Sequence, residues 1–112
     1  MKLDTHEGVF ADPAAVEDIA RAVTGLTEVG AAFIVLNDDR DDMAFVQAAG
    51  TVDEDFLVEY RDGGAGDHFR GDRRAKAAEL VALLTLYLSR DPSWRDATTW
   101  HRVRVDQPAP SA

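Results

Sequence analysis

Apolar residues recur at the spacing of one helix face near the start of the chain. Asp12 and Pro13 are typical of a helix start, because the carboxylate accepts from free N–H groups and proline is tolerated in the first turn. Gly25 is typical of a helix end. The pattern predicts a short amphipathic helix from Asp12 to Thr24. Its apolar positions are Val16, Ile19, Ala20 and Val23.

A longer helical pattern runs from Arg73 to Arg90. Asp91 and Pro92 end it, since proline cannot continue a helix and restricts the residue before it. An apolar face of this length must be buried against another layer. Its members are Ala77, Leu80, Leu83, Leu84, Tyr87 and Leu88.

Between the two helices the pattern changes to that of strands. The near-continuous apolar run "AAFIVLN" favours a strand covered on both faces or in the centre of a sheet. In "DFLVEYR", Phe56, Val58 and Tyr60 alternate with a second set that includes Glu59, so the two sets lie on opposite faces. The strands are expected at residues 31–37, 43–49, 55–61, 67–70 and 99–105.

The order of these elements, α-β-β-β-β-α-β, predicts an α+β fold. We expect an antiparallel meander of about five strands with two helices packed on one face. No linker divides the chain, so residues 1–106 are expected to form a single domain. The final segment, residues 107–112, has the composition of a disordered tail.

Composition and net charge limit the classes of partner that the protein can bind. The 112 residues are 46% hydrophobic, which is typical of a globular protein, and carry a net charge of −9. That charge repels nucleic acid and anionic membranes and favours basic partners. There is no cysteine, no apolar leader and no stretch long enough to span a membrane. We expect a cytoplasmic protein that binds neither nucleic acid nor membrane.

Four aspartates occupy five positions in "NDDRDD": Asp38, Asp39, Asp41 and Asp42. A calcium loop beginning at Asn37 would need glycine at its sixth position and glutamate at its twelfth, but the chain has Asp42 and Ala48 there. A hairpin turn between two strands accounts for the geometry. It leaves the concentration of negative charge unexplained.

Other chemical sites are weakly indicated. The glycine-rich "DGGAGDHF" lacks the lysine and hydroxyl residue of a phosphate loop, which favours a hairpin. His6, His68 and His101 are far apart in sequence, so solvated histidines are expected over a metal site. The other acids are expected at the surface rather than in a catalytic cleft. We therefore expect no cofactor, no metal and no enzymatic activity.

The aromatic residues near the second helix favour one of two roles. Trp94 and Trp100 lie beyond its end, and Tyr60 and Phe69 are on strands that could lie nearby. Each tryptophan is either part of the core or an interface anchor. Aromatic anchors rimmed by carboxylates are typical of a surface that binds a basic partner.

The segments "FIVLNDDRDDMAFVQAAG", "FLVEYRDG", "HFR" and "LVALLTLYLSRDPSWRDATTW" resemble the bacterial immunity proteins encoded beside polymorphic toxins, particularly toxins of the nucleic-acid deaminase superfamily. The resemblance runs from about Ala32 to Trp100. It rests on hydrophobic and aromatic patterns rather than on a catalytic signature. It implies a small cytoplasmic α+β protein that binds its cognate toxin and blocks substrate access.

On this view the acids take the place of phosphate on the basic surface of the toxin. The complex is expected to contain toxin and this chain in a 1:1 ratio, and this chain is expected to be a monomer or a small homo-oligomer. An acidic adaptor unrelated to toxins would have the same sequence features. The hypothesis places the acids of both turns along one end of the sheet, with aromatic anchors nearby. The expected contacts are Asp38, Asp39, Asp41, Asp42, Asp53, Glu54, Asp55, Glu59, Tyr60, Trp94 and Trp100.

Overall fold

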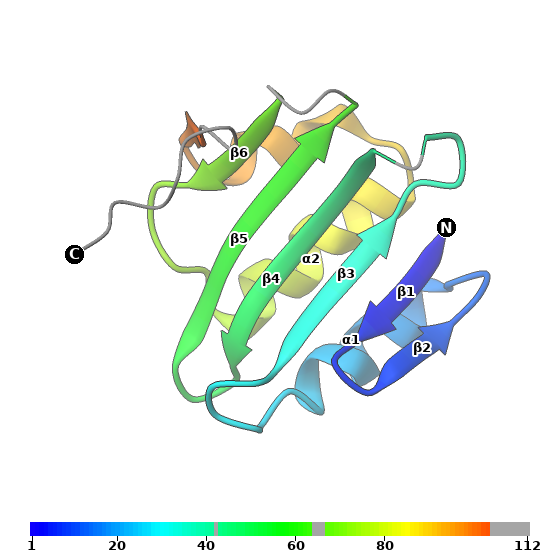
Figure 1. The fold of residues 1–112 in the computed structure, drawn as a ribbon, viewed down its shortest axis with the longest axis vertical. Helices are drawn as coiled ribbons and strands as arrows, with labels where there is room; N and C mark the ends of the chain where they lie inside the picture. The colour runs from blue at the N-terminus through cyan, green and yellow to red at the C-terminus, as the bar shows by residue number, and fades with distance from the viewer. Residues whose placement is uncertain (42, 64–66, 104–112) are drawn as a thin grey trace.

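The computed structural model describes residues 1–41, 43–63 and 67–103. Over these residues the chain forms one antiparallel sheet of seven strands, in the order β2-β1-β3-β4-β5-β6-β7, with two α-helices and one short 3-10 helix (Figure 1). The strands are β1 (Lys2–Thr5), β2 (Gly8–Ala11), β3 (Phe33–Asn37), β4 (Ala44–Thr51), β5 (Asp55–Asp62), β6 (His68–Gly71) and β7 (Trp100–Arg102). The helices are α1 (Val16–Thr24), α2 (Ala77–Leu88) and η1 (Pro92–Ala97).

The predicted α+β class and the meander from β3 to β6 are confirmed. The estimate of about five strands and two helices was too low. The missing hairpin, β1 with β2, has only four residues in each strand, and in β1 only alternate residues are buried. Such short segments lack the apolar run that marks the central strands. η1 is not among the predicted elements, because six residues are too few for a periodic pattern.

Both α-helices begin later than predicted. The N–H of Ala15 donates to the Asp18 carboxylate at 2.8 Å, so α1 starts at Val16 rather than at Asp12. The N–H of Lys76 donates to the Glu79 carboxylate at 3.0 Å, and α2 starts at Ala77. In each case an acidic side chain on the third helical residue caps the helix. This signal is weaker in the sequence than an aspartate followed by proline.

Both α-helices lie on the same face of the sheet (Figure 1). The inward-facing residues of the strands alternate with outward-facing ones, and the inward set is almost fully buried against the helices. Burial of this apolar area is the main favourable term in folding. The strand side of the core includes Leu3, Ile34, Leu36, Val46, Ala48, Phe56, Val58 and Tyr60. The helix side includes Ile19, Val23, Leu80, Leu83, Leu84 and Tyr87.

The opposite face of the sheet is covered by no described element (Figure 1). The expected strand "AAFIVLN" is therefore central in the sheet but is covered on one face only. Phe33 shows the consequence, because 41% of its surface is exposed. We call this surface the open face. Its central residues are Phe33, Val35, Phe45, Gln47, Ala49, Leu57, Glu59 and Arg61.

The two long hairpins turn at opposite ends of the sheet. The β3–β4 turn contains Asp38 to Asp41, and the β4–β5 turn contains Asp53 and Glu54. Gly50 is needed beside the second turn, because a Cβ there would clash with the carbonyl oxygen of Asp55. Within the described residues no helix is long and apolar enough to cross a membrane. Asp42, the end of the predicted last strand and the predicted tail lie outside the described residues.

Candidate functional site

The centre of the open face contains a hollow built by three cross-strand neighbours. Ala49 on β4 is paired with Phe33 on β3 and with Leu57 on β5. Because alanine is small and its two neighbours are large, the face is indented at Ala49. The hollow has a volume of about 310 Å³, and Val35, Gln47 and Glu59 also line it. We call this feature the Ala49 notch.

The next row across the open face is polar from β4 to β6. Glu59 pairs in register with Gln47 on β4 and with Arg70 on β6. Its carboxylate lies 2.6 Å from His68 Nε2 and accepts a hydrogen bond from Arg70 Nη2 at 3.2 Å. His68 is only 8% exposed, contrary to the expectation that the histidines are solvated. Glu59 does lie opposite Phe56, Val58 and Tyr60 as predicted, and its charge is compensated within the fold.

The predicted acidic contacts are not brought together. Asp39 and Asp41 lie at one end of the sheet, and Asp53 and Glu54 lie at the other. The hypothesis of a single acidic end was wrong because a hairpin reverses the chain: turns on the two sides of β4 must be separated by the length of that strand. Asp55, at the start of β5, belongs to the second end.

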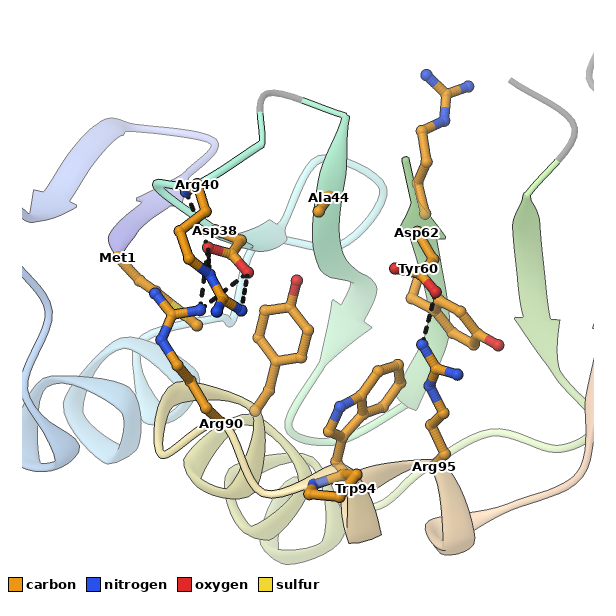
Figure 2. Close-up of a pocket in the computed structure, with 12 residues that line it drawn as sticks. Met1, Asp38, Arg40, Ala44, Tyr60, Asp62, Arg90, Trp94 and Arg95 are labelled. Atoms are coloured by element: carbon orange, nitrogen blue, oxygen red, sulfur yellow. Dashed lines mark hydrogen bonds and ion pairs between the residues drawn. The ribbon is translucent and has the colours of Figure 1, made fainter. Parts of the chain in front are cut away.

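Asp38 makes the most side-chain contacts of the described acids in the first turn, and its side chain is largely withdrawn from solvent. Its side chain is 11% exposed and accepts hydrogen bonds from the guanidinium groups of Arg40 and Arg90 (Figure 2). Burial alone would raise the pKa of the carboxyl. The backbone N–H of Arg40 and the two guanidinium groups outweigh that effect and lower the pKa from 3.8 to about 2. Asp38 is therefore a charged structural group.

The other described acids of this turn also have partners inside the chain. Asp39 lies 2.6 Å from the amino group of Met1, and Asp41 accepts from the backbone N–H of Met43 at 2.8 Å. The side-chain amide of Asn37 donates to Asp4 at 3.1 Å. These are the contacts of a turn rather than of a calcium loop. Among the described residues, no three His, Asp or Glu side chains are placed to hold a metal ion.

The three histidines contact three different carboxylates. His6 lies 3.4 Å from Glu28, and His101 lies 2.9 Å from Asp72. His68 contacts Glu59, as described above. The fold therefore does not assemble the histidines into one site.

The predicted proximity of the aromatic residues is confirmed. The ring of Tyr60 is stacked on Phe69 at 4.9 Å, and meets the rings of Trp94 and Trp100 edge to face, both at 4.8 Å. Tyr60 and Trp94 are each only 6% exposed, so their packing places them in the core. Trp100 is partly buried, and its indole N–H donates to the carbonyl oxygen of Arg95 at 2.9 Å. Of the two roles considered for the tryptophans, the geometry favours the core for Trp94.

A second hollow, also of about 310 Å³, lies where the β3–β4 turn meets the end of α2 (Figure 2). Arg40 and Arg90 lie on one side of it beside Asp38, and Arg95 lies on the other side beside Trp94. Tyr60 and Tyr87 also line it. We call this feature the arginine pocket. Burial, together with the charges of Asp38 and Asp62, raises the pKa of Tyr87 to about 12, so its hydroxyl keeps its proton at neutral pH.

Sequence reasoning missed the arginine pocket because its arginines come from separate segments. Arg40 lies in a turn, Arg90 follows α2 and Arg95 lies in η1. No sequence signal marked these arginines as neighbours, and only the structure shows the unusual backbone at Arg90. Arg90 has φ +59°, the left-handed conformation in which a helix usually ends with glycine, and a charged residue at such a position is unusual.

Comparison of the chain with family models, with curated proteins and with solved structures finds no match.

Proposed function

We propose that this protein is an immunity protein: it binds a cognate bacterial toxin, a nucleic-acid deaminase, and neutralises it by blocking access to the toxin's substrate-binding site. The sequence resemblance described above supports the toxin pairing. The open face supports the mode of binding. It combines an exposed apolar centre with a polar surround, which is the usual anatomy of a protein interface.

The Ala49 notch is the observation that carries this proposal. Apolar side chains that remain exposed together on a folded protein commonly mark a binding surface. Here they surround a hollow of about 310 Å³, large enough to receive an apolar side chain of a partner. Binding energy in protein interfaces is concentrated where an anchor fills such a depression. The partner's anchor would insert between Phe33 and Leu57.

The charge of the chain indicates the chemistry of the partner. The net charge of −9 favours association with a basic protein, and a deaminase that binds nucleic acid must be basic where it contacts phosphate. The exposed acids Asp39, Asp53 and Glu54 lie at the two ends of the sheet and flank the open face. They would therefore steer the encounter from both ends, rather than forming one acidic patch.

A mixing experiment tests the proposal. The purified chain is added to the C-terminal toxin domain encoded by the adjacent gene, and the mixture is followed by size-exclusion chromatography and by a deaminase assay. We expect a 1:1 complex, loss of deaminase activity, and slower association at high salt because screening weakens steering. No complex and undiminished activity would reject the toxin pairing, and would leave an adaptor as the better account.

Variants of one position test the docking surface. Ala49→Trp fills the notch, and we expect it to weaken toxin binding roughly tenfold or more, the effect of losing an interface anchor. Ala49→Ser is the matched control, because it keeps the hollow open. Equal affinity of the Trp and Ser variants for the toxin would place the interface elsewhere on the chain.

A further inference from the structure

The arginine pocket has an excess of positive charge in a strongly acidic protein. Arg40 and Arg90 share the single carboxylate of Asp38, with nitrogen to oxygen distances of 3.3 and 3.1 Å. Arg95 has its own partner, Asp62, at 2.7 Å. Two guanidinium groups on one carboxylate leave one positive charge uncompensated within this cluster. Asp38 remains ionised at neutral pH and keeps both guanidinium groups in place.

These arginines also keep free hydrogen-bond donors. Arg90 uses only Nη1 for its contacts with Asp38, and Arg40 uses Nε and Nη2. Arg95 uses only Nη2 for Asp62, whereas a guanidinium group carries five N–H donors. The planar arrangement of those donors suits two-point recognition of a carboxylate or a phosphate. The pocket therefore offers both the charge and the donors that an oxyanion needs.

Arg90 holds a backbone conformation that its residue type disfavours. Its N–H donates to the carbonyl oxygen of Tyr87, and the N–H of Asp91 donates to that of Leu86, both at 3.0 Å. These two bonds form the helix end in which glycine is the usual residue at the left-handed position. An arginine there is strained relative to glycine, because its Cβ crowds the following carbonyl oxygen. Residues held in such conformations are concentrated at functional sites.

On the other side of the arginine pocket, Arg95 covers a cluster of buried aromatic rings. The guanidinium group of Arg95 lies over the rings of Trp94 and Tyr60, with its carbon 5.1 and 5.5 Å from their centres. Trp94 and Tyr87 meet edge to face at 5.2 Å. Aromatic and guanidinium surfaces of this kind favour a flat ring. The volume of about 310 Å³ is at the lower end of the range for small-molecule sites.

We propose that the arginine pocket is a binding site for a small organic anion, a carboxylate or phosphate group carried on a planar ring. The oxyanion binds the free donors of Arg90 and Arg40, and the ring lies against the guanidinium group of Arg95, which covers the rings of Trp94 and Tyr60. This site is separate from the Ala49 notch on the open face and does not depend on the proposed toxin binding. It can be tested on the isolated chain.

Titration calorimetry with four probes tests this site. Adenosine 5′-monophosphate and indole-3-carboxylate each combine an oxyanion with a ring. Adenosine lacks the anion, and inorganic phosphate lacks the ring. We expect at least one of the two ring anions to bind with 1:1 stoichiometry, and at least about tenfold more tightly than adenosine or phosphate, since hydrogen bonds to charged groups and ring contacts each contribute. The preferred ring anion then shows which combination of ring and oxyanion the site accepts.

Arg90→Gly is the decisive variant, because glycine is well suited to the backbone conformation there and the helix end is retained. We expect its affinity for the preferred ring anion to fall about tenfold to a hundredfold. Arg74→Ala, which removes an exposed arginine near the opposite end of the sheet, should bind as the parent does.

Three results would overturn the site: neither ring anion binds, adenosine or phosphate binds as tightly as the ring anions, or Arg90→Gly retains the parent's affinity.

Discussion

Arg90 Nη1 contacts both carboxylate oxygens of Asp38, at 3.2 and 3.1 Å, across 52 residues of sequence. This contact joins the β3–β4 turn to the end of α2. It also explains why an aspartate in an acidic turn is withdrawn from solvent. The stability of the chain in acid should depend on this carboxyl, because its pKa is lowered to about 2 in the folded state.

Asp38→Asn should destabilise the protein by about 1–3 kcal/mol at pH 7, since the variant leaves two guanidinium groups without their acceptor charge. A lowered folded-state pKa contributes stability above the unfolded value of 3.8, and that contribution is lost as the pH falls towards 2. Urea unfolding at pH 7 and at pH 2 measures both effects. The variant should differ from the parent at pH 7 and much less at pH 2. Asp96→Asn is the exposed control, and an equal response of the two variants would contradict the role given to Asp38.

Arg90 should show opposing contributions to stability. Arg90→Gly loses the contact with Asp38 but relieves the left-handed backbone, whereas Arg90→Ala loses the contact and keeps the strain. The glycine variant is therefore expected to be about 1 kcal/mol more stable than the alanine variant. Chemical unfolding of the two proteins under identical conditions measures this difference. If alanine were as stable as glycine, the left-handed conformation would carry no cost.

Tyr87 should make the protein sensitive to alkali. Burial raises its pKa to about 12, and the nearby charges of Asp38 and Asp62 add to the shift. An unfolded tyrosine ionises near its ordinary value of 10.0, so the stability contributed by the raised pKa is complete below pH 10 and is lost as the pH rises towards 12. Tyr87→Phe should flatten this part of the stability profile, as measured by unfolding between pH 9 and pH 12. A profile as steep as the parent's would assign the alkaline response to other groups.

Leu84 tests the packing of α2 on the sheet. It is fully buried, so Leu84→Ala should reduce the free energy of unfolding by about 2–5 kcal/mol through lost burial and a residual cavity. Val29→Ala is the control, because Val29 is 72% exposed and its truncation should change stability by less than about 0.5 kcal/mol. Thermal or denaturant unfolding measures both variants. Similar results for the two would mean that α2 contributes little to the core.

Ala49→Trp separates binding from folding. Ala49 is exposed on the open face, so the larger side chain should change the free energy of unfolding by less than about 1 kcal/mol. The same variant is expected to lose affinity for the toxin, as argued above. Unfolding measurements on the isolated variant check the first point. A strongly destabilised variant would show that the notch is part of the core packing and not a free depression.

Patterns along the chain were enough to predict the α+β class and the part of the core that lies in α2 and β5. Alternation in "DFLVEYR" correctly separated Phe56, Val58 and Tyr60 from Glu59, and the spacing of Leu80, Leu83, Leu84 and Tyr87 identified the buried side of α2. These features are local. Side-chain direction repeats every two residues in a strand and every 3.6 residues in a helix. The order of apolar and polar residues along the chain therefore predicts which side chains are buried.

The contacts between groups far apart in the sequence follow from the packing of the layers and could not be predicted. The tertiary structure placed the acids of the two turns at opposite ends of the sheet, because β4 runs between them, and it buried Asp38 against Arg90. It also left one face of the sheet open and formed the notch between Phe33, Ala49 and Leu57 from three strands. Strand register and the pairing of charges across many residues depend on how the layers pack, and no periodicity along the chain encodes them.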